Sequence, residues 1–174
     1  EKTRLKIIPY DAYTKGYEAA GEIFSVNNNA ALVITNIKTS GDSDEICISY
    51  DIYDAENNTC EIKLWYLTPD AKEFVKSVNA SGELKNVQTG AGKKIIWKSR
   101  LDFTRDYDRV IVKLSADDGN LKSADSVSEP FKVFNNRPPV ISNIFVSPDY
   151  GDISVNFDMF DPDGDDCDIE LMYS

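Results

Sequence analysis

The feature that most constrains this chain is an internal repeat at a fixed offset of 107 residues. Residues 33–66 align without a gap on residues 140–173, and 13 of these 34 positions are identical. The same offset places Phe24 on Phe131. A period of about 100 residues is typical of strings of β-sandwich domains, whereas solenoid repeats are roughly 20–50 residues long. The repeat therefore predicts consecutive units that share one β architecture.

The repeat divides the chain of 174 residues unevenly. Residues 1–28 correspond to the C-terminal strands of a preceding unit, residues 29–136 to a complete unit, and residues 137–174 to the N-terminal strands of a following unit. Two interpretations stay open. In the first, the chain is a segment of a longer array. In the second, its two partial ends pair with neighbouring chains and build a head-to-tail fibre.

Alternating side chains predict β-strands along the whole chain. Ile46, Ile48 and Tyr50 alternate with more polar residues at a period of two, and no stretch shows a sustained helical stripe. Clusters of asparagine, glycine and aspartate separate these runs, as expected for turns. The expected fold is all-β, an antiparallel β-sandwich in which one complete repeat is flanked by partial repeats.

The repeat register also predicts which side chains are hidden. Tyr50 and Phe157 fall on equivalent positions and are expected to be buried in similar surroundings. Cys60 and Cys167 lie in register with inward-facing residues, so we expect buried free thiols that act as small apolar groups.

Composition excludes several classes of function. The chain has 19 basic and 30 acidic residues, a net charge of −11, which disfavours nucleic-acid binding through phosphate neutralisation. It contains no histidine, so histidine-based catalytic triads and histidine zinc sites are ruled out. No apolar run approaches about 18 residues, so we expect no membrane insertion in this segment. The sequence predicts no enzyme.

A series of glycine, aromatic, acidic and proline positions runs through the complete repeat and into the next. These positions are Gly92, Ile96, Trp97, Ser99, Asp102, Val110, Val112, Ala116, Asp118, Gly119, Pro130, Phe131, Val133, Asn135, Pro138 and Pro139. In this order they resemble the fibronectin type III-like and Ig-like tandem repeats of bacterial surface and secreted proteins. The resemblance implies an Ig-like β-sandwich, an extracytoplasmic location (secreted, cell surface or periplasmic) and a role as a spacer, adhesive unit or assembly domain.

An acidic loop is the sharpest local motif. Alternating carboxylates around Gly164 can converge on a hard cation such as Ca²⁺, although the same residues also suit an ordinary turn. The equivalent loop of the complete repeat carries fewer carboxylates, and the Ig-like topology places it at the same pole as the loop before the last strand. The candidate Ca²⁺ ligands are Asp161, Asp163, Asp165 and Asp166, together with Asp54, Glu56, Asp117 and Asp118. No cofactor is otherwise required.

Outward-facing aromatic residues define a candidate interface. Strand parity places Trp65 on the outer face, next to Tyr53 on a neighbouring strand, and their counterparts Met172 and Phe160 are also apolar. We expect this face to contact other protein chains or copies of this chain. Simple cover within the domain and carbohydrate stacking are the alternatives.

Together these observations predict a non-enzymatic structural module of a large extracytoplasmic protein. Its role would be protein–protein association, spacing or filament-like assembly. The alternatives are a Ca²⁺- or carbohydrate-binding adhesive module, or an accessory domain of a secreted hydrolase.

Overall fold

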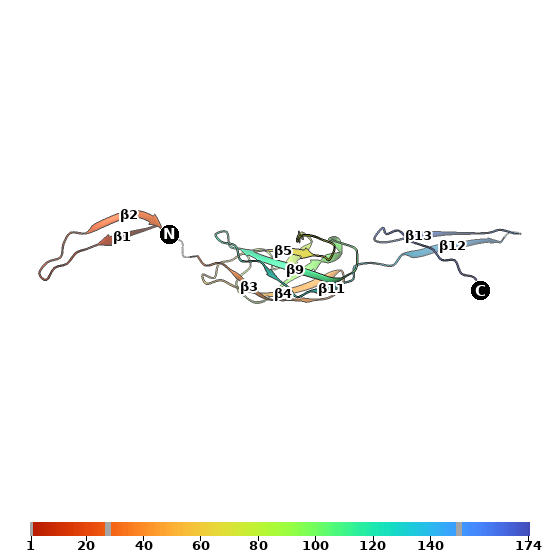
Figure 1. Cartoon of the computed structure of the whole chain (residues 1–174), viewed down its shortest axis with the longest axis horizontal. Coiled ribbons are helices and arrows are strands. Elements are labelled where there is room, and N and C mark those ends of the chain that lie inside the picture. Colours follow the sequence, from red (N-terminus) through yellow and green to blue (C-terminus); the bar gives the residue numbers. More distant parts are fainter. Residues whose placement is uncertain (1, 27–28, 149–150) are drawn as a thin grey trace.

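The computed structural model describes residues 2–26, 29–148 and 151–174, and in these ranges every regular element longer than three residues is a β-strand. The expected all-β fold is confirmed. A central β-sandwich lies between two β-hairpins, one at each end of the long axis of the molecule (Figure 1).

The central sandwich consists of two antiparallel sheets. One has the order β3-β4-β8-β7, and the other has the order β10-β9-β5-β6 with β11 also paired to β9. The first sheet comprises β3 (Val33–Ser40), β4 (Glu45–Tyr53), β8 (Gly90–Lys98) and β7 (Ala80–Gly82). The second comprises β10 (Ser126–Val127), β9 (Tyr107–Asp117), β5 (Glu61–Leu67), β6 (Val75–Lys76) and β11 (Phe131–Val133). A short 3-10 turn, η1 (Ser99–Leu101), follows β8.

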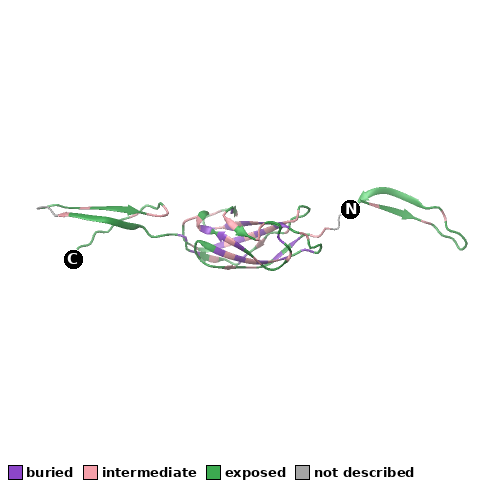
Figure 2. Ribbon diagram, turned by 180° about the vertical axis from the view of Figure 1, so that it is seen from behind, coloured by how far each residue is buried: buried purple, intermediate pink, exposed green. Residues whose placement is uncertain are grey.

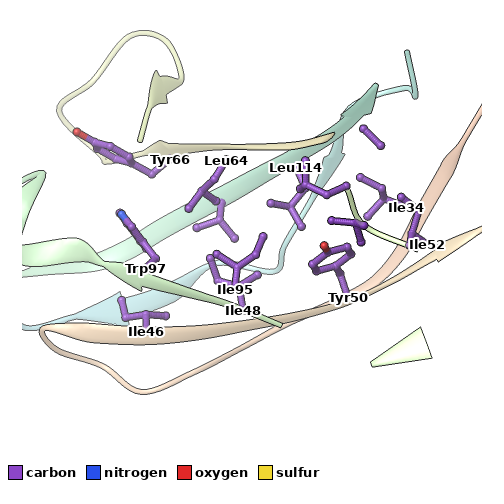
Figure 3. Packing of buried hydrophobic residues seen from close by; sticks show 14 of the residues in the cluster. Ile34, Ile46, Ile48, Tyr50, Ile52, Leu64, Tyr66, Ile95, Trp97 and Leu114 are labelled. Atoms are coloured by element: carbon purple, nitrogen blue, oxygen red, sulfur yellow. The ribbon is translucent and has the colours of Figure 1, made fainter. Parts of the chain in front are cut away.

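Strict alternation fills the space between the two sheets. Every second residue is buried in β4, in β5 and in β9 from Val110 to Ala116, as the period-two pattern requires. Figure 3 shows these side chains converging from both layers. Trp97 lies at one end of this core, where its ring stacks on Tyr66 at a centroid distance of 5.3 Å and meets the Phe103 ring edge-on at 5.9 Å. Cys60 is buried, as expected.

The two hairpins are single layers. They are formed by β1 (Lys2–Ile7) with β2 (Ala19–Ser25), and by β12 (Val140–Pro148) with β13 (Ile153–Phe160). Most of their described residues are exposed, in contrast to the sandwich (Figure 2).

Both hairpins nevertheless reproduce strand registers of the sandwich at the offset of 107. In the first hairpin Ile7 pairs with Ala19, as Leu114 pairs with Ser126 in β9 and β10. In the second hairpin every pair reported for β3 and β4 recurs in β12 and β13.

Even an irregularity in the strands is repeated. The register shifts between Thr35 and Lys38 in β3, and the equivalent shift occurs in β12. Asn36 and Asn143 stand at these bulges with φ of 54° and 53°, in the left-handed region that asparagine tolerates. Each amide donates a hydrogen bond of 2.6 Å to an aspartate of the partner strand.

Two predictions about burial are wrong. Tyr50 is fully buried but Phe157 is 36% exposed, and Cys167 is only half-buried. The backbone register is the same in both repeats, but no second sheet covers the inner face of β12 and β13 in the described part of the chain. Covering by a second layer, rather than strand pairing, hides these side chains in the sandwich.

Candidate functional site

The first junction is a polar network at one pole of the sandwich. Asn29, which follows the first hairpin, donates from Nδ2 to Asp118 Oδ2 at 2.8 Å and accepts from Asn58 Nδ2 at 2.9 Å. The Ala30 N–H donates to Glu56 Oε2 at 3.1 Å. The structure therefore brings the incoming linker together with the two acidic loops, which the Ig-like topology placed at the same pole.

The predicted calcium ligands at this pole do not share one centre. Asp54 is buried, and its Oδ2 accepts the Asn58 N–H at 2.7 Å, while its Oδ1 has no hydrogen-bond partner within the described residues. Asp117 instead accepts the Gly119 N–H at 3.0 Å. Nowhere in residues 2–26, 29–148 or 151–174 do three acidic or thiol side chains form a group that could hold a metal. Calcium binding stays a prediction.

Asp118, at the first junction, makes the free energy of unfolding depend on pH in the acid range. The N–H of Leu121 and the Asn29 amide hold the pKa of Asp118 at about 2, below its ordinary value of 3.8. Asp118 therefore stabilises the fold above about pH 4, and this contribution is lost as the pH falls towards 2. We expect Asp118→Asn to lose that part of the pH dependence in urea unfolding measured at several pH values. Asp108→Asn, at an exposed ion pair with Lys132, should retain it.

The second junction is an ion-paired contact between the sandwich and the second hairpin. Arg100 forms an ion pair with Asp163 Oδ1, and the Arg137 N–H donates to Asp163 Oδ2 at 2.6 Å. The Asp163 side chain is only 2% exposed. Burial opposes its ionisation, but the hydrogen bonds from Arg137 and Arg100 and their positive charges together hold the pKa of Asp163 below its ordinary value.

Buried polar contacts fix Arg100 in place. Asn135 is fully buried and accepts both the Asp44 N–H at 3.2 Å and the Ser99 hydroxyl at 3.0 Å. The Ser99 N–H donates to the Asp44 carbonyl at 2.9 Å. These hydrogen bonds hold the turn that carries Arg100 in place. The Arg100 guanidinium also lies 3.6 Å from Asp44 Oδ1.

The acidic loop after β13 forms a turn that presents Asp163. Asp161 Oδ1 accepts the N–H groups of Asp163 at 2.8 Å and Asp165 at 3.2 Å, and Gly164 has φ of 75°. Asp165 and Asp166 are exposed. The Arg100 guanidinium meets the central carboxylate of this loop. The sequence did not identify Arg100 as the partner of Asp163, because the spacing of 63 residues between them leaves no local signal.

The predicted Trp65–Tyr53 patch is not formed. Tyr53 ends β4 and Trp65 lies in β5, but these consecutive strands belong to different sheets. Tyr53 is exposed, whereas the face of Trp65 is covered by the Lys113 ammonium, 4.8 Å from the ring centroid. Strand parity gave the outward direction of Trp65 correctly but could not show which sheet holds it. Phe160 and Met172, their counterparts, are both exposed.

The inner faces of the two hairpins carry apolar side chains that are open to solvent. Side chains on them are exposed, although their equivalents at the offset of 107 in the sandwich are buried. On the first hairpin these side chains are Leu5 and Ile7, which are equivalent to Val112 and Leu114. On the second hairpin they are Ile141, Ile153, Phe157 and Met159, which are equivalent in this order to Ile34, Ile46, Tyr50 and Ile52. Contiguous exposed apolar surface marks interaction sites.

No known family model, curated protein or solved structure matches this chain. Across the described ranges, no helix has both the length and the apolar character needed to traverse a bilayer.

Proposed function

We propose that this chain is a non-enzymatic structural module of a large extracytoplasmic protein, and that it mediates protein–protein association, spacing and filament-like assembly. The observation that carries the proposal is the contrast in burial between equivalent residues. Tyr50 and Ile46 are fully buried in the sandwich, whereas Phe157 and Ile153 lie open on the second hairpin. An apolar sheet face of this kind favours a further β layer as its cover.

The ordered second junction supports the spacing role. Arg100 of the sandwich and the Arg137 N–H of the linker both bind Asp163, and Pro138 and Pro139 restrict the backbone that follows. A unit held in this way transmits its orientation to the next one. The absence of histidine and the resemblance to surface-protein repeats support the non-enzymatic and extracytoplasmic parts of the proposal.

The spacing role is tested by cutting the Arg100–Asp163 contact. Pulsed electron paramagnetic resonance would measure the distance between one spin label on the sandwich and one on β13. We expect a narrow distribution in the wild type and a broad one in Arg100→Ala, because the variant loses the contact between Asp163 and the sandwich and keeps the hydrogen bond from the Arg137 N–H and the half-exposed Arg137–Asp44 ion pair.

Arg105→Ala is the matched control, since Arg105 is exposed and lies outside this contact. An equally broad distribution in the wild type and in Arg100→Ala would refute a spacing role for this junction.

A further inference from the structure

We propose that the β1–β2 hairpin of one copy completes the β12–β13 hairpin of a second copy, and that the C-terminal segment of the second copy adds as a strand to the free edge of β1, with residues 171–174 opposite residues 4–7. This inference rests on the proposed function, since it names the partner of the exposed faces as another copy of the same chain. Each step follows from the sandwich, where the equivalent strands already meet.

The first step is an open strand edge. In the sandwich β9 pairs with β10 and β11 on one edge and with β5 on the other. β1 has the same register with β2 that β9 has with β10 and β11, since Thr3 pairs with Phe24 as Val110 pairs with Phe131. Among the described residues no strand occupies the edge of β1 that corresponds to β5.

The second step is a segment suited to that edge. Residues 168–174 are equivalent to β5, and Ile169, Leu171 and Tyr173 match its buried residues in type and spacing. In this structure the segment is not a strand, and these side chains are exposed, Tyr173 completely. A peptide of this pattern binds a sheet edge through backbone hydrogen bonds, while alternate side chains enter the interior.

The sandwich also supplies the register of the pairing. Leu64 pairs with Leu114 and Tyr66 with Val112 in β5 and β9. Adding the offset of 107 to the β5 residues and subtracting it from the β9 residues transfers these pairs to the hairpins. Leu171 then lies opposite Ile7 of the other copy, and Tyr173 lies opposite Leu5. A slip by one residue would turn all of these apolar side chains to solvent, so the register is strongly specified.

The third step is the second layer. In the sandwich β3 lies against β9 and β10, and the Ser126 hydroxyl donates to the Ile34 carbonyl at 2.8 Å. The equivalent layers here are β12–β13 of one copy and β1–β2 of the other. Their open inner faces, including Phe157 and Ile7, would then cover one another as the equivalent faces do in the sandwich.

Charge favours the same pairing. β1 carries Lys2, Arg4 and Lys6 and no acidic residue, whereas residues 165–174 carry four acidic residues and no basic one. In the register given above, Arg4 and Lys6 lie opposite Ser174 and Met172, and Glu170 lies diagonal to Lys6. The opposite net charges of the two segments therefore act mainly by steering their approach.

The geometry fixes the type of assembly. The two hairpins present different surfaces, so the contact is heterologous and leaves one open hairpin at each end of any oligomer. Since the hairpins lie at opposite ends of the molecule, successive copies would form a linear chain (Figure 1).

Directed cross-linking tests the register. One variant carries Leu5→Cys and another Tyr173→Cys, both with Cys47 and Cys167 changed to serine. Mixed and oxidised, they should give a disulfide-linked dimer. Met172→Cys replaces Tyr173→Cys in the control and should not cross-link, because strand parity turns Met172 to the opposite face. Equal cross-linking of the two pairs, or none in either, would overturn the pairing.

Sedimentation velocity separates this inference from the proposed function. The wild type should form oligomers larger than a dimer as its concentration rises. Ile7→Asp and Leu171→Asp should each weaken association by about tenfold or more, without unfolding the sandwich, since both residues are exposed. Tyr53→Asp, on an exposed site outside the proposed contact, is the control.

The outcomes are distinct. Association that survives Ile7→Asp and Leu171→Asp would overturn this pairing but leave the proposed function intact. A wild type that stays monomeric at high concentration would overturn the pairing too, and the spin-label measurement on Arg100 would then decide the spacing role by itself.

Discussion

Replacing Trp97 by alanine is expected to lower the free energy of unfolding of the sandwich by about 3–5 kcal/mol. Trp97 is fully buried, and its ring packs against Tyr66 and Phe103. Its indole N–H also donates to Asp102 Oδ2 at 2.6 Å. Alanine would leave a cavity between the sheets and remove the donor from a carboxylate that also binds Ser77 and Asn79.

Denaturant unfolding followed by far-ultraviolet circular dichroism measures this loss. Trp65→Ala is the matched control, because Trp65 lies half-buried on the outer face and should cost about 1 kcal/mol. Equal losses for the two tryptophans would contradict the assignment of Trp97 to the core.

Replacing Gly82 by alanine is expected to cost about 3 kcal/mol or more. Gly82 has φ of 100°, a conformation that side chains rarely adopt, and an added Cβ would lie 2.6 Å from the Lys94 carbonyl oxygen. That oxygen belongs to the neighbouring strand β8, so relief requires the β7–β8 pairing to shift. The edge of the first sheet would therefore be weakened.

Gly92→Ala separates backbone strain from this collision. Gly92 also has a positive φ, 69°, but its Cβ would meet nothing within 4 Å. We expect a loss of only about 1 kcal/mol there. Thermal unfolding of both variants gives the comparison, and similar melting temperatures would show that the contact with Lys94 is not limiting.

Much of the fold follows from local pattern. The alternation around Ile48 predicted β4 and the side it buries, because a period of two leaves a strand only one apolar face. The repeat predicted equivalent strand pairs, and the asparagine at the Asn36 bulge recurs as Asn143 with the same backbone angle and the same bond to an aspartate.

Properties that depend on distant partners were not predictable in this way. The exposure of Phe157 depends on whether a second sheet covers β13, which its own sequence does not determine. The separation of Tyr53 and Trp65 depends on where the chain crosses between sheets. The contact of Arg100 with Asp163 joins residues from different units, and nothing near either one in sequence indicates the other.

The contact between Arg100 and Asp163 has a mechanical consequence. It joins one end of the sandwich to a turn of the following unit at a point beside the linker, so rotation about the linker axis is restrained as well as bending. Copies connected end to end would then share one angle of twist per unit, and the filament would have a defined helical pitch. Because both side chains of this ion pair are largely buried, salt screens it only weakly, so that pitch should persist as ionic strength rises.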